Sequence, residues 1–189
     1  MATSNVKTDT RTRIMLAAQE LAEESMTVEG VTISLESVAK RADLTKPGLM
    51  YYFPTKQDLM VGVVAYAAEE WDKRLSAQAG ATVESLSPYD RHRAYVRDAT
   101  TAELSRSDFW VFSDAVYQPA LTQGWQEHLA PWFSTKGLPA EISSLLQTAR
   151  FCADGAWMSE ATGVCRADDL LAIQGHALAL IDKAEGLAS

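Results

Sequence analysis

Two tyrosines, a phenylalanine and two lysines gather in the stretch LTKPGLMYYFPTKQDLM, residues 44–60. Tyrosine suits contact with a phosphate backbone, because it carries a hydroxyl donor on a rigid arm that loses little entropy on binding. Lysine neutralises phosphate charge. These residue types therefore indicate a surface that contacts nucleic acid. Pro47 and Pro54 stand on either side of its three aromatic residues.

A helix-turn-helix would position these side chains. Short helices are predicted over 35–42 and 46–53, joined by a three-residue turn. Ser34 and Thr45 are the expected N-caps, since their hydroxyls can accept hydrogen bonds from backbone N–H groups of the first turn. A unit this small needs other helices over its apolar side, and these are predicted over about 10–25 and 56–79.

The side chains of the second short helix divide into an inner and an outer set. Leu49 and Phe53, four residues apart, are expected to face inward, so Tyr51 and Tyr52 project away from the core. The N-terminal end of such a helix usually reads base edges, and helix N-termini also attract phosphate. The predicted DNA-binding residues are Ser34, Thr45, Lys46, Gly48, Tyr51, Tyr52 and Lys56.

The rest of the chain also has helical periodicity, with no alternating strand pattern and no repeat. We therefore predict an all-α fold of about nine helices. Its expected domains are 1–56, which would bind DNA, and 57–189, which would bind ligand and dimerise. The remaining predicted helices run over about 88–105, 107–117, 119–135, 139–162 and 167–184.

The net charge of −8 over 189 residues argues at face value against a nucleic-acid partner. The charge is uneven, however. Residues 1–56 carry seven basic and seven acidic side chains, so the acidic excess belongs to the remaining 133 residues. The acidic bulk and the candidate DNA-binding segment are therefore different parts of the chain.

Other sequence signals exclude several classes. Cys152 and Cys165 lie outside any CxxC or Cys/His cluster, and His92, His128 and His176 are scattered, so no metal or cofactor is expected. The longest apolar run, VGVVAYAA, is too short to span a membrane, and the N-terminus has no apolar segment typical of a secretion signal. A cytoplasmic protein is predicted.

Aromatic and acidic residues share helix faces in the acidic part. Trp110, Asp114 and Tyr117 are spaced i, i+4, i+7, and Asp154 lies beside Trp157. Aromatic walls with a carboxylate suit a flat or bulky organic cation. Core packing and solvated helix-face charges are the alternative interpretations of such residues. The predicted ligand-binding residues are Tyr66, Glu70, Trp110, Asp114, Tyr117, Trp125, Trp132, Asp154, Trp157 and Met158.

Residues 13–59 resemble the N-terminal signature of the TetR family of transcriptional repressors. RIMLAAQELA (13–22) and SLESVAKRADLTKPGLMYYFPTKQDL (34–59) keep the spacings and the aromatic residues of that signature. Asp43 replaces the usual glycine of the turn, and Pro47 with Gly48 removes side-chain readout at two positions. Glu36 stands where a basic residue is often found. These departures bear on the operator sequence rather than on the fold.

The resemblance implies a dimeric repressor that binds a palindromic operator and is released by a small molecule. YFPTKQDLMVGVVAYAAEEWDKRL and TARFCADGAWMSEATGV look similar to the subgroup that senses drugs and cationic biocides and controls efflux pumps. Dimerisation is expected through the helices at about 139–162 and 167–184. Small residues would allow their close approach: Ala153, Gly155, Ala156, Ala161, Ala177 and Ala179.

Other functional classes were weighed against this one. A helical protein-interaction module that no longer binds DNA fits the acidic total and the Pro47-Gly48 pair. A TetR-type regulator of metabolism that senses a neutral or acyl ligand fits the fold equally well. An enzyme is not expected, because the sequence has no nucleophile elbow, HExxH or glycine-rich phosphate loop.

Overall fold

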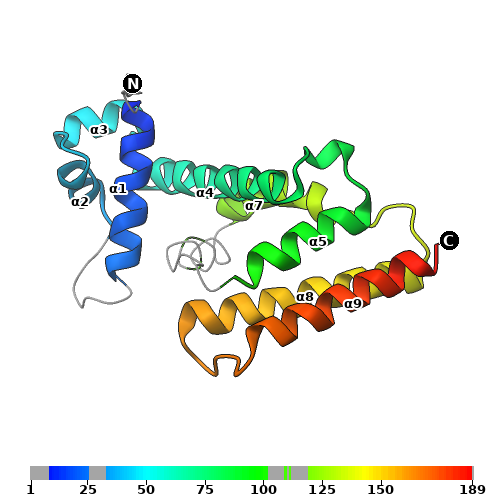
Figure 1. Cartoon of the computed structure of the whole chain (residues 1–189). Helices are drawn as coiled ribbons and strands as arrows, with labels where there is room; N and C mark the ends of the chain where they lie inside the picture. Colours follow the sequence, from blue (N-terminus) through cyan, green and yellow to red (C-terminus); the bar gives the residue numbers. More distant parts are fainter. Residues whose placement is uncertain (1–8, 26–32, 102–108, 110, 112–118, 189) are drawn as a thin grey trace, which may run out of the picture. The chain divides into compact units, whose positions relative to one another are not determined.

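The computed structural model describes residues 9–25, 33–101, 109, 111 and 119–188, and within them it contains eight α-helices and no strand (Figure 1). The predicted all-α fold is confirmed. The helix expected over 107–117 lies almost wholly outside the described residues. The helices are α1 (Thr10–Ser25), α2 (Leu35–Arg41), α3 (Lys46–Tyr52), α4 (Lys56–Ala79), α5 (Pro88–Ala99), α7 (Pro119–Phe133), α8 (Ala140–Thr162) and α9 (Leu170–Gly186), with a 3₁₀ turn at Val83–Ser85.

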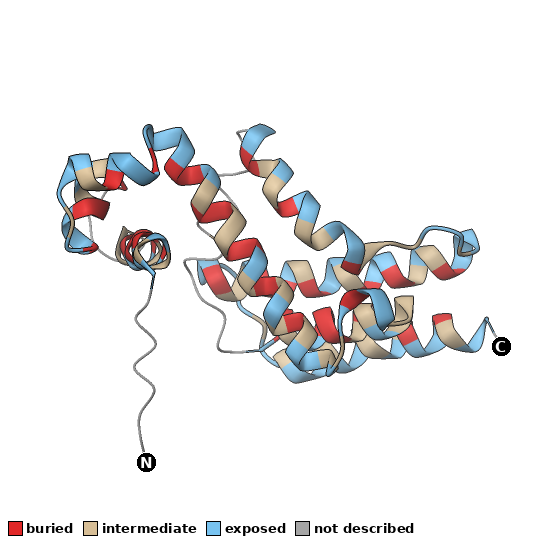
Figure 2. Ribbon diagram, turned by 90° about the horizontal axis from the view of Figure 1, so that it is seen from above, coloured by how far each residue is buried: buried red, intermediate tan, exposed pale blue. Residues whose placement is uncertain are grey.

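Two compact units divide the chain. Unit 1 comprises residues 1–66 and 106–121, and unit 2 comprises residues 67–105 and 122–189. The division falls within α4, which supplies residues to both units. The expected domains, 1–56 and 57–189, stay a prediction. Buried and exposed residues alternate along the helices in both units, as expected for amphipathic helices (Figure 2).

Capping residues begin the short helices of unit 1 where the sequence predicts them. Ser34 accepts the backbone N–H of Ser37 at 3.0 Å, and the Ser37 hydroxyl accepts that of Ser34 at 2.9 Å. Thr45 accepts the N–H of Gly48 at 3.1 Å and so begins α3. Asp43, in the turn between α2 and α3, has a φ of 55°, a conformation that aspartate tolerates better than most residues.

A small apolar core holds the helix-turn-helix together. Val38, Leu49 and Phe53 are at most 2% exposed, so the predicted inward face of α3 is confirmed. A Cβ on Gly62 of α4 would lie 2.6 Å from Cε1 of Phe53. Glycine at this position therefore lets the Phe53 ring pack against α4, and Arg11 covers the ring at 4.8 Å.

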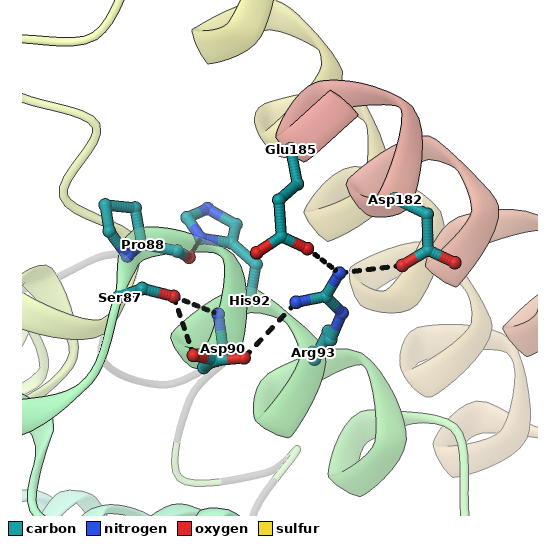
Figure 3. Close-up of polar contacts among 7 residues, drawn as sticks. All are labelled: Ser87, Pro88, Asp90, His92, Arg93, Asp182 and Glu185. Carbon is teal, nitrogen blue, oxygen red and sulfur yellow. Dashed lines mark hydrogen bonds and ion pairs between the residues drawn. The ribbon is translucent and has the colours of Figure 1, made fainter. Parts of the chain in front are cut away.

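Unit 2 is built on α8 and α9, which pack along each other, with α5 packed against both (Figure 1). Arg93 joins α5 to α9 (Figure 3). Its guanidinium donates to Asp90 at 3.2 Å, to Asp182 at 2.7 Å and to Glu185 at 2.5 Å. Its side chain is only 18% exposed, but its three carboxylate partners are 46–67% exposed, so water still screens these ion pairs.

Two predicted helix ends are wrong. Helix α5 ends at Ala99 rather than near 105. The hydroxyls of Thr100 and Thr101 donate back to the carbonyls of Val96 and Asp98, and such bonds compete with continuation of a helix. Helix α9 begins at Leu170 rather than near 167, because the Asp169 side chain caps it by accepting the N–H of Ala172 at 2.9 Å.

Candidate functional site

The outer side of α3, which we call the α3 face, consists of Lys46, Tyr51 and Tyr52. Tyr51 is 83% exposed and Tyr52 is 36% exposed, with their rings edge to face at 5.2 Å. Lys46 is exposed at the first position of the helix, and Lys56 is exposed at the first position of α4. Two cations and two phenol groups are thus available to a partner from outside unit 1.

The other residues predicted to bind DNA take part in the caps of α2 and α3. The Ser34 hydroxyl is engaged with Ser37, and that of Thr45 with the N–H of Gly48. A Cβ on Gly48 would lie 3.1 Å from the Thr45 hydroxyl oxygen. Gly48 therefore leaves room for the cap that begins α3, in addition to whatever contact its backbone makes.

Two arginines of unit 1 hold the helix-turn-helix together. Arg41 forms ion pairs with Glu20 at 3.3 Å and Glu24 at 2.7 Å, which join α2 to α1. Arg13 donates to the carbonyl of Ala42 at 2.6 Å. The positive charges of these two arginines are thus committed to contacts within unit 1, whereas Lys46 and Lys56 face solvent.

A group of four rings in unit 2, here called the aromatic cluster, consists of the buried Trp71, Tyr95 and Trp157 and the half-buried Phe133. Ring centres are 5.8 Å apart for Trp71 and Tyr95, 5.7 Å for Trp71 and Trp157, and 4.6 Å for Tyr95 and Phe133. Trp157 was predicted from sequence. The other three rings were missed, because they come from α4, α5 and α7 and share no helix face with it.

Asp154 of α8 is bonded on both carboxylate oxygens. Oδ1 accepts the Tyr95 hydroxyl at 2.5 Å, and Oδ2 lies 3.3 Å from Nε of Arg150. Burial raises the pKa of Asp154, and this outweighs the lowering by the Tyr95 hydrogen bond and the Arg150 charge. Burial, together with the Asp154 charge, raises the pKa of Tyr95 well above its ordinary value. Burial therefore disfavours the charged form of Asp154, and a positive neighbour such as Arg150 favours it.

Two further polar groups lie inside unit 2. His92 is 1% exposed, and its Nδ1 lies 2.7 Å from the carbonyl of Pro88 (Figure 3). Among the described residues, Nε2 of His92 has no hydrogen-bond partner. Burial lowers the pKa of His92. Asp98, whose pKa burial raises, pairs with Arg74 at 3.5 Å.

The remaining predicted ligand residues that the structure describes have different surroundings. Trp132 is fully buried, and its Nε1 donates to Asp72 at 2.7 Å. Glu70 pairs with Lys73 at 2.9 Å on the surface, and Met158 is 50% exposed. Trp125 is buried and Tyr66 is half-buried. Trp110, Asp114 and Tyr117, which the sequence placed on one helix face, lie outside the described residues.

Arg150 is the charged residue that the sequence interpretation missed. It lies four residues before Asp154 on α8, a spacing at which opposite charges meet on a helix. That spacing was a usable signal. In the described parts of the chain, no three His, Cys, Asp or Glu side chains are grouped to hold a metal ion. No helix among those parts is long and apolar enough to cross a membrane.

Comparisons with known proteins agree with these features. A family model described as "Tetracyclin repressor-like, C-terminal domain" matches residues 90–182. No curated protein matches the chain.

Several solved structures share the fold. A protein assigned to the TetR family of transcriptional regulators, from Rhodococcus sp., is 17% identical with a TM-score of 0.66, covering 93% of this chain and 98% of that one. A TetR family member from Streptomyces coelicolor A3 is 17% identical with a TM-score of 0.63 and the same two coverages. The multidrug binding protein EbrR complexed with ethidium is 18% identical with a TM-score of 0.62, covering 91% of this chain and 98% of that one.

Proposed function

We propose that this protein is a DNA-binding repressor released by a small molecule. Residues 90–182 match the tetracyclin repressor-like C-terminal domain, and the chain has the fold of TetR-family structures, as its sequence resemblance predicts. The α3 face carries the proposal. Its lysine and two tyrosines face solvent over a core in which Leu49 and Phe53 are buried. A short helix with this division can present one side to a major groove.

Different contacts are assigned to the polar residues of unit 1. Tyr51, Tyr52 and Lys56 would bind phosphates, which fixes the orientation on DNA without reading its sequence. Lys46, at the N-terminal end of α3, would read base edges. Lys46→Ala should therefore change base preference across a randomised operator library. Unaltered preference would remove Lys46 from sequence readout.

Exposed small and apolar residues on α8 and α9 support the proposed dimerisation through these helices. Gly155, Met158, Leu171 and Ala179 are all exposed on these helices. We propose that two copies pack them into a four-helix bundle around a two-fold axis. The two α3 helices would then lie about 34–36 Å apart, or near a multiple of that distance, to fit one side of a palindromic operator. Sedimentation of the full chain should give a dimer.

The proposed inducer is an aromatic or amphiphilic cation, and the proposed target is the gene of an efflux pump. The repressor itself would act in the cytoplasm. The support is the aromatic cluster with Asp154 at its edge, and the likeness to EbrR, whose structures are complexed with ethidium and proflavin. Asp114 remains the other proposed counter-charge. Because α4 supplies residues to both units, we propose that it transmits ligand binding to the helix-turn-helix.

Anisotropy of a labelled fragment of the DNA upstream of the gene tests this function. The full-length protein should bind the fragment, and tetraphenylphosphonium, a cation that does not intercalate, should release it. Linkage requires that the fragment weaken tetraphenylphosphonium binding by the same factor. Release by fatty acyl compounds instead would support a metabolic regulator. Failure to bind the fragment would favour a protein-interaction module.

A further inference from the structure

Arg150 lies against two aromatic rings and a carboxylate of unit 2. Its guanidinium carbon is 4.8 Å from the centre of the Phe133 ring and 4.5 Å from that of the Phe151 ring. Its Nε is 3.3 Å from Oδ2 of Asp154. Aromatic faces with a nearby carboxylate are the surroundings that favour an organic cation. Unit 2 therefore already contains a cation site, and a cation of the chain itself occupies it.

We propose that Arg150 occupies the place of the cationic ligand and is displaced when that ligand binds. The ligand would take the Phe133 ring and the Asp154 carboxylate, both of which Arg150 contacts in its absence. This inference rests on the proposed function, since it names the ligand class and the side chain that competes with it. Arg150 would then set the affinity threshold for inducers.

The Asp154 carboxylate favours replacement of one cation by another. Tyr95 fixes one carboxylate oxygen by a hydrogen bond, so the other oxygen keeps its position when Arg150 leaves. A partly buried carboxylate without a positive neighbour is costly, because its charge has lost part of its hydration. A ligand that carries positive charge can satisfy Asp154, whereas a neutral ligand of the same shape cannot.

Arg150 is not enclosed on all sides. Its side chain is 28% exposed and that of Asp154 is 36% exposed, although Nε of Arg150 is itself buried. Phe151 is 57% exposed and follows Arg150 directly in the chain. A withdrawn guanidinium can keep its contact with Phe151 while it gives up Phe133 and Asp154. The exchange therefore needs a rotamer change rather than unfolding of α8.

Removing the Arg150 charge should strengthen binding of a cationic probe. Arg150→Met keeps an unbranched apolar stem, Arg150→Gln is a second charge-removing change, and Arg150→Lys keeps a competing charge. Ethidium titrated into the full-length protein without DNA should bind the Met and Gln variants about tenfold more tightly than wild type, because the cation–π and charge contacts no longer have to be exchanged. The Lys variant should stay within about threefold of wild type, since an ammonium also pairs with carboxylates and rings.

Two controls separate this competition from general effects. Arg166→Met removes an arginine that pairs with Glu160 at 3.8 Å, and it should leave ethidium binding unchanged. Adding Asp154→Asn to Arg150→Met should abolish the gain, because the carboxylate that favours the cation is gone. Circular dichroism should show that each variant keeps wild-type helicity, and ethidium should raise the Tm of Arg150→Met more than that of wild type.

Three results would overturn the inference. Ethidium binding by wild type with equal or weaker binding by both charge-removing variants would show that Arg150 does not compete. In that case the proposed repressor function would stand. Tighter binding of anionic anilinonaphthalene sulfonate to wild type than to Arg150→Met would identify an anion site instead. If neither the wild type nor any variant binds ethidium, both this inference and the cationic-inducer proposal are wrong. DNA binding is measured separately and would still test the repressor function.

Discussion

In unit 1 Lys46, Tyr51 and Tyr52, which are proposed to bind DNA, face solvent, whereas in unit 2 Asp154, which is proposed to bind ligand, is held by Tyr95 and Arg150. Tyr51 is 83% exposed above a buried Leu49. Tyr95 is buried and donates to Asp154, which also pairs with Arg150. The same residue type thus serves a surface in one unit and a buried network in the other. A partner can meet the α3 face without rearrangement, but a ligand of unit 2 has to exchange existing contacts.

The largest effect on stability is expected for Tyr95→Phe in unit 2, and the same change at Tyr52 in unit 1 is its counterpart. Tyr95→Phe removes the hydroxyl that donates to Asp154 and leaves a partly buried carboxylate with one partner fewer. The free energy of unfolding should fall by about 1–3 kcal/mol, the cost of losing a hydrogen bond to a charged group. Urea unfolding followed by tryptophan fluorescence measures it. An unchanged midpoint would mean that the Tyr95–Asp154 bond contributes nothing in solution.

Gly62→Ala tests how tightly the core of unit 1 is packed. The added Cβ would lie 2.6 Å from the Phe53 ring, and overpacking of this kind costs about 1–3 kcal/mol. The better helix propensity of alanine returns at most about 1 kcal/mol, so a net loss is expected, with weaker DNA binding and unchanged ethidium binding. In the matched control, Gly175→Ala in α9, a Cβ meets nothing within 4 Å. If Gly62→Ala is as stable as that control, the Phe53 ring can shift to accommodate the added Cβ at little cost.

His92 should make unit 2 sensitive to acid. Its pKa is lowered in the folded protein by burial, so below its ordinary value of 6.5 the unfolded chain binds the proton more readily. Stability is therefore present above about pH 6.5 and falls as the pH is lowered, by at most about 1.4 kcal/mol per pH unit. His92→Asn should flatten urea-midpoint changes between about pH 7 and 5. Identical slopes for the two proteins would mean that His92 titrates normally.

Tyr52→Phe should have the smallest effect on stability. Removal of an exposed hydroxyl changes the free energy of unfolding by less than about 0.5 kcal/mol, in contrast to Tyr95→Phe. Operator affinity should weaken a few-fold, since one hydrogen bond to phosphate is lost. Anisotropy at moderate salt measures this. Wild-type affinity would remove Tyr52 from the phosphate contacts.

Local signals account for what the sequence could predict. Helix α4 begins and ends where predicted, at 56 and 79. Thr55 and Asp58 exchange capping hydrogen bonds at 3.0 and 3.1 Å where the helix begins, and Gly80, with a φ of 70°, follows its end. The α3 face was predictable for a similar reason, since its residues lie within seven positions and their orientation follows from helical spacing.

Contacts between distant segments account for what the sequence could not predict. Tyr95 and Asp154 are 59 residues apart, and neither spacing nor residue type connects them. Trp132, predicted as a ligand wall from its helix face, donates from Nε1 to Asp72 of α4 in a fully buried position, a contact that its sequence position does not indicate. Packing of α4, α5, α7 and α8 against each other decides these pairs, so a single sequence gives the residue types of unit 2 without their partners.

The most direct test of the central claim is the salt dependence of DNA binding by the wild-type protein and Lys56→Ala. Both proteins are titrated with the DNA upstream of the gene over a series of salt concentrations. We predict that the logarithm of the binding constant falls linearly with the logarithm of salt, and that the slope for Lys56→Ala is smaller by about one. No binding at low salt, or the same slope and affinity for both proteins, would contradict a repressor that holds phosphates with this helix-turn-helix.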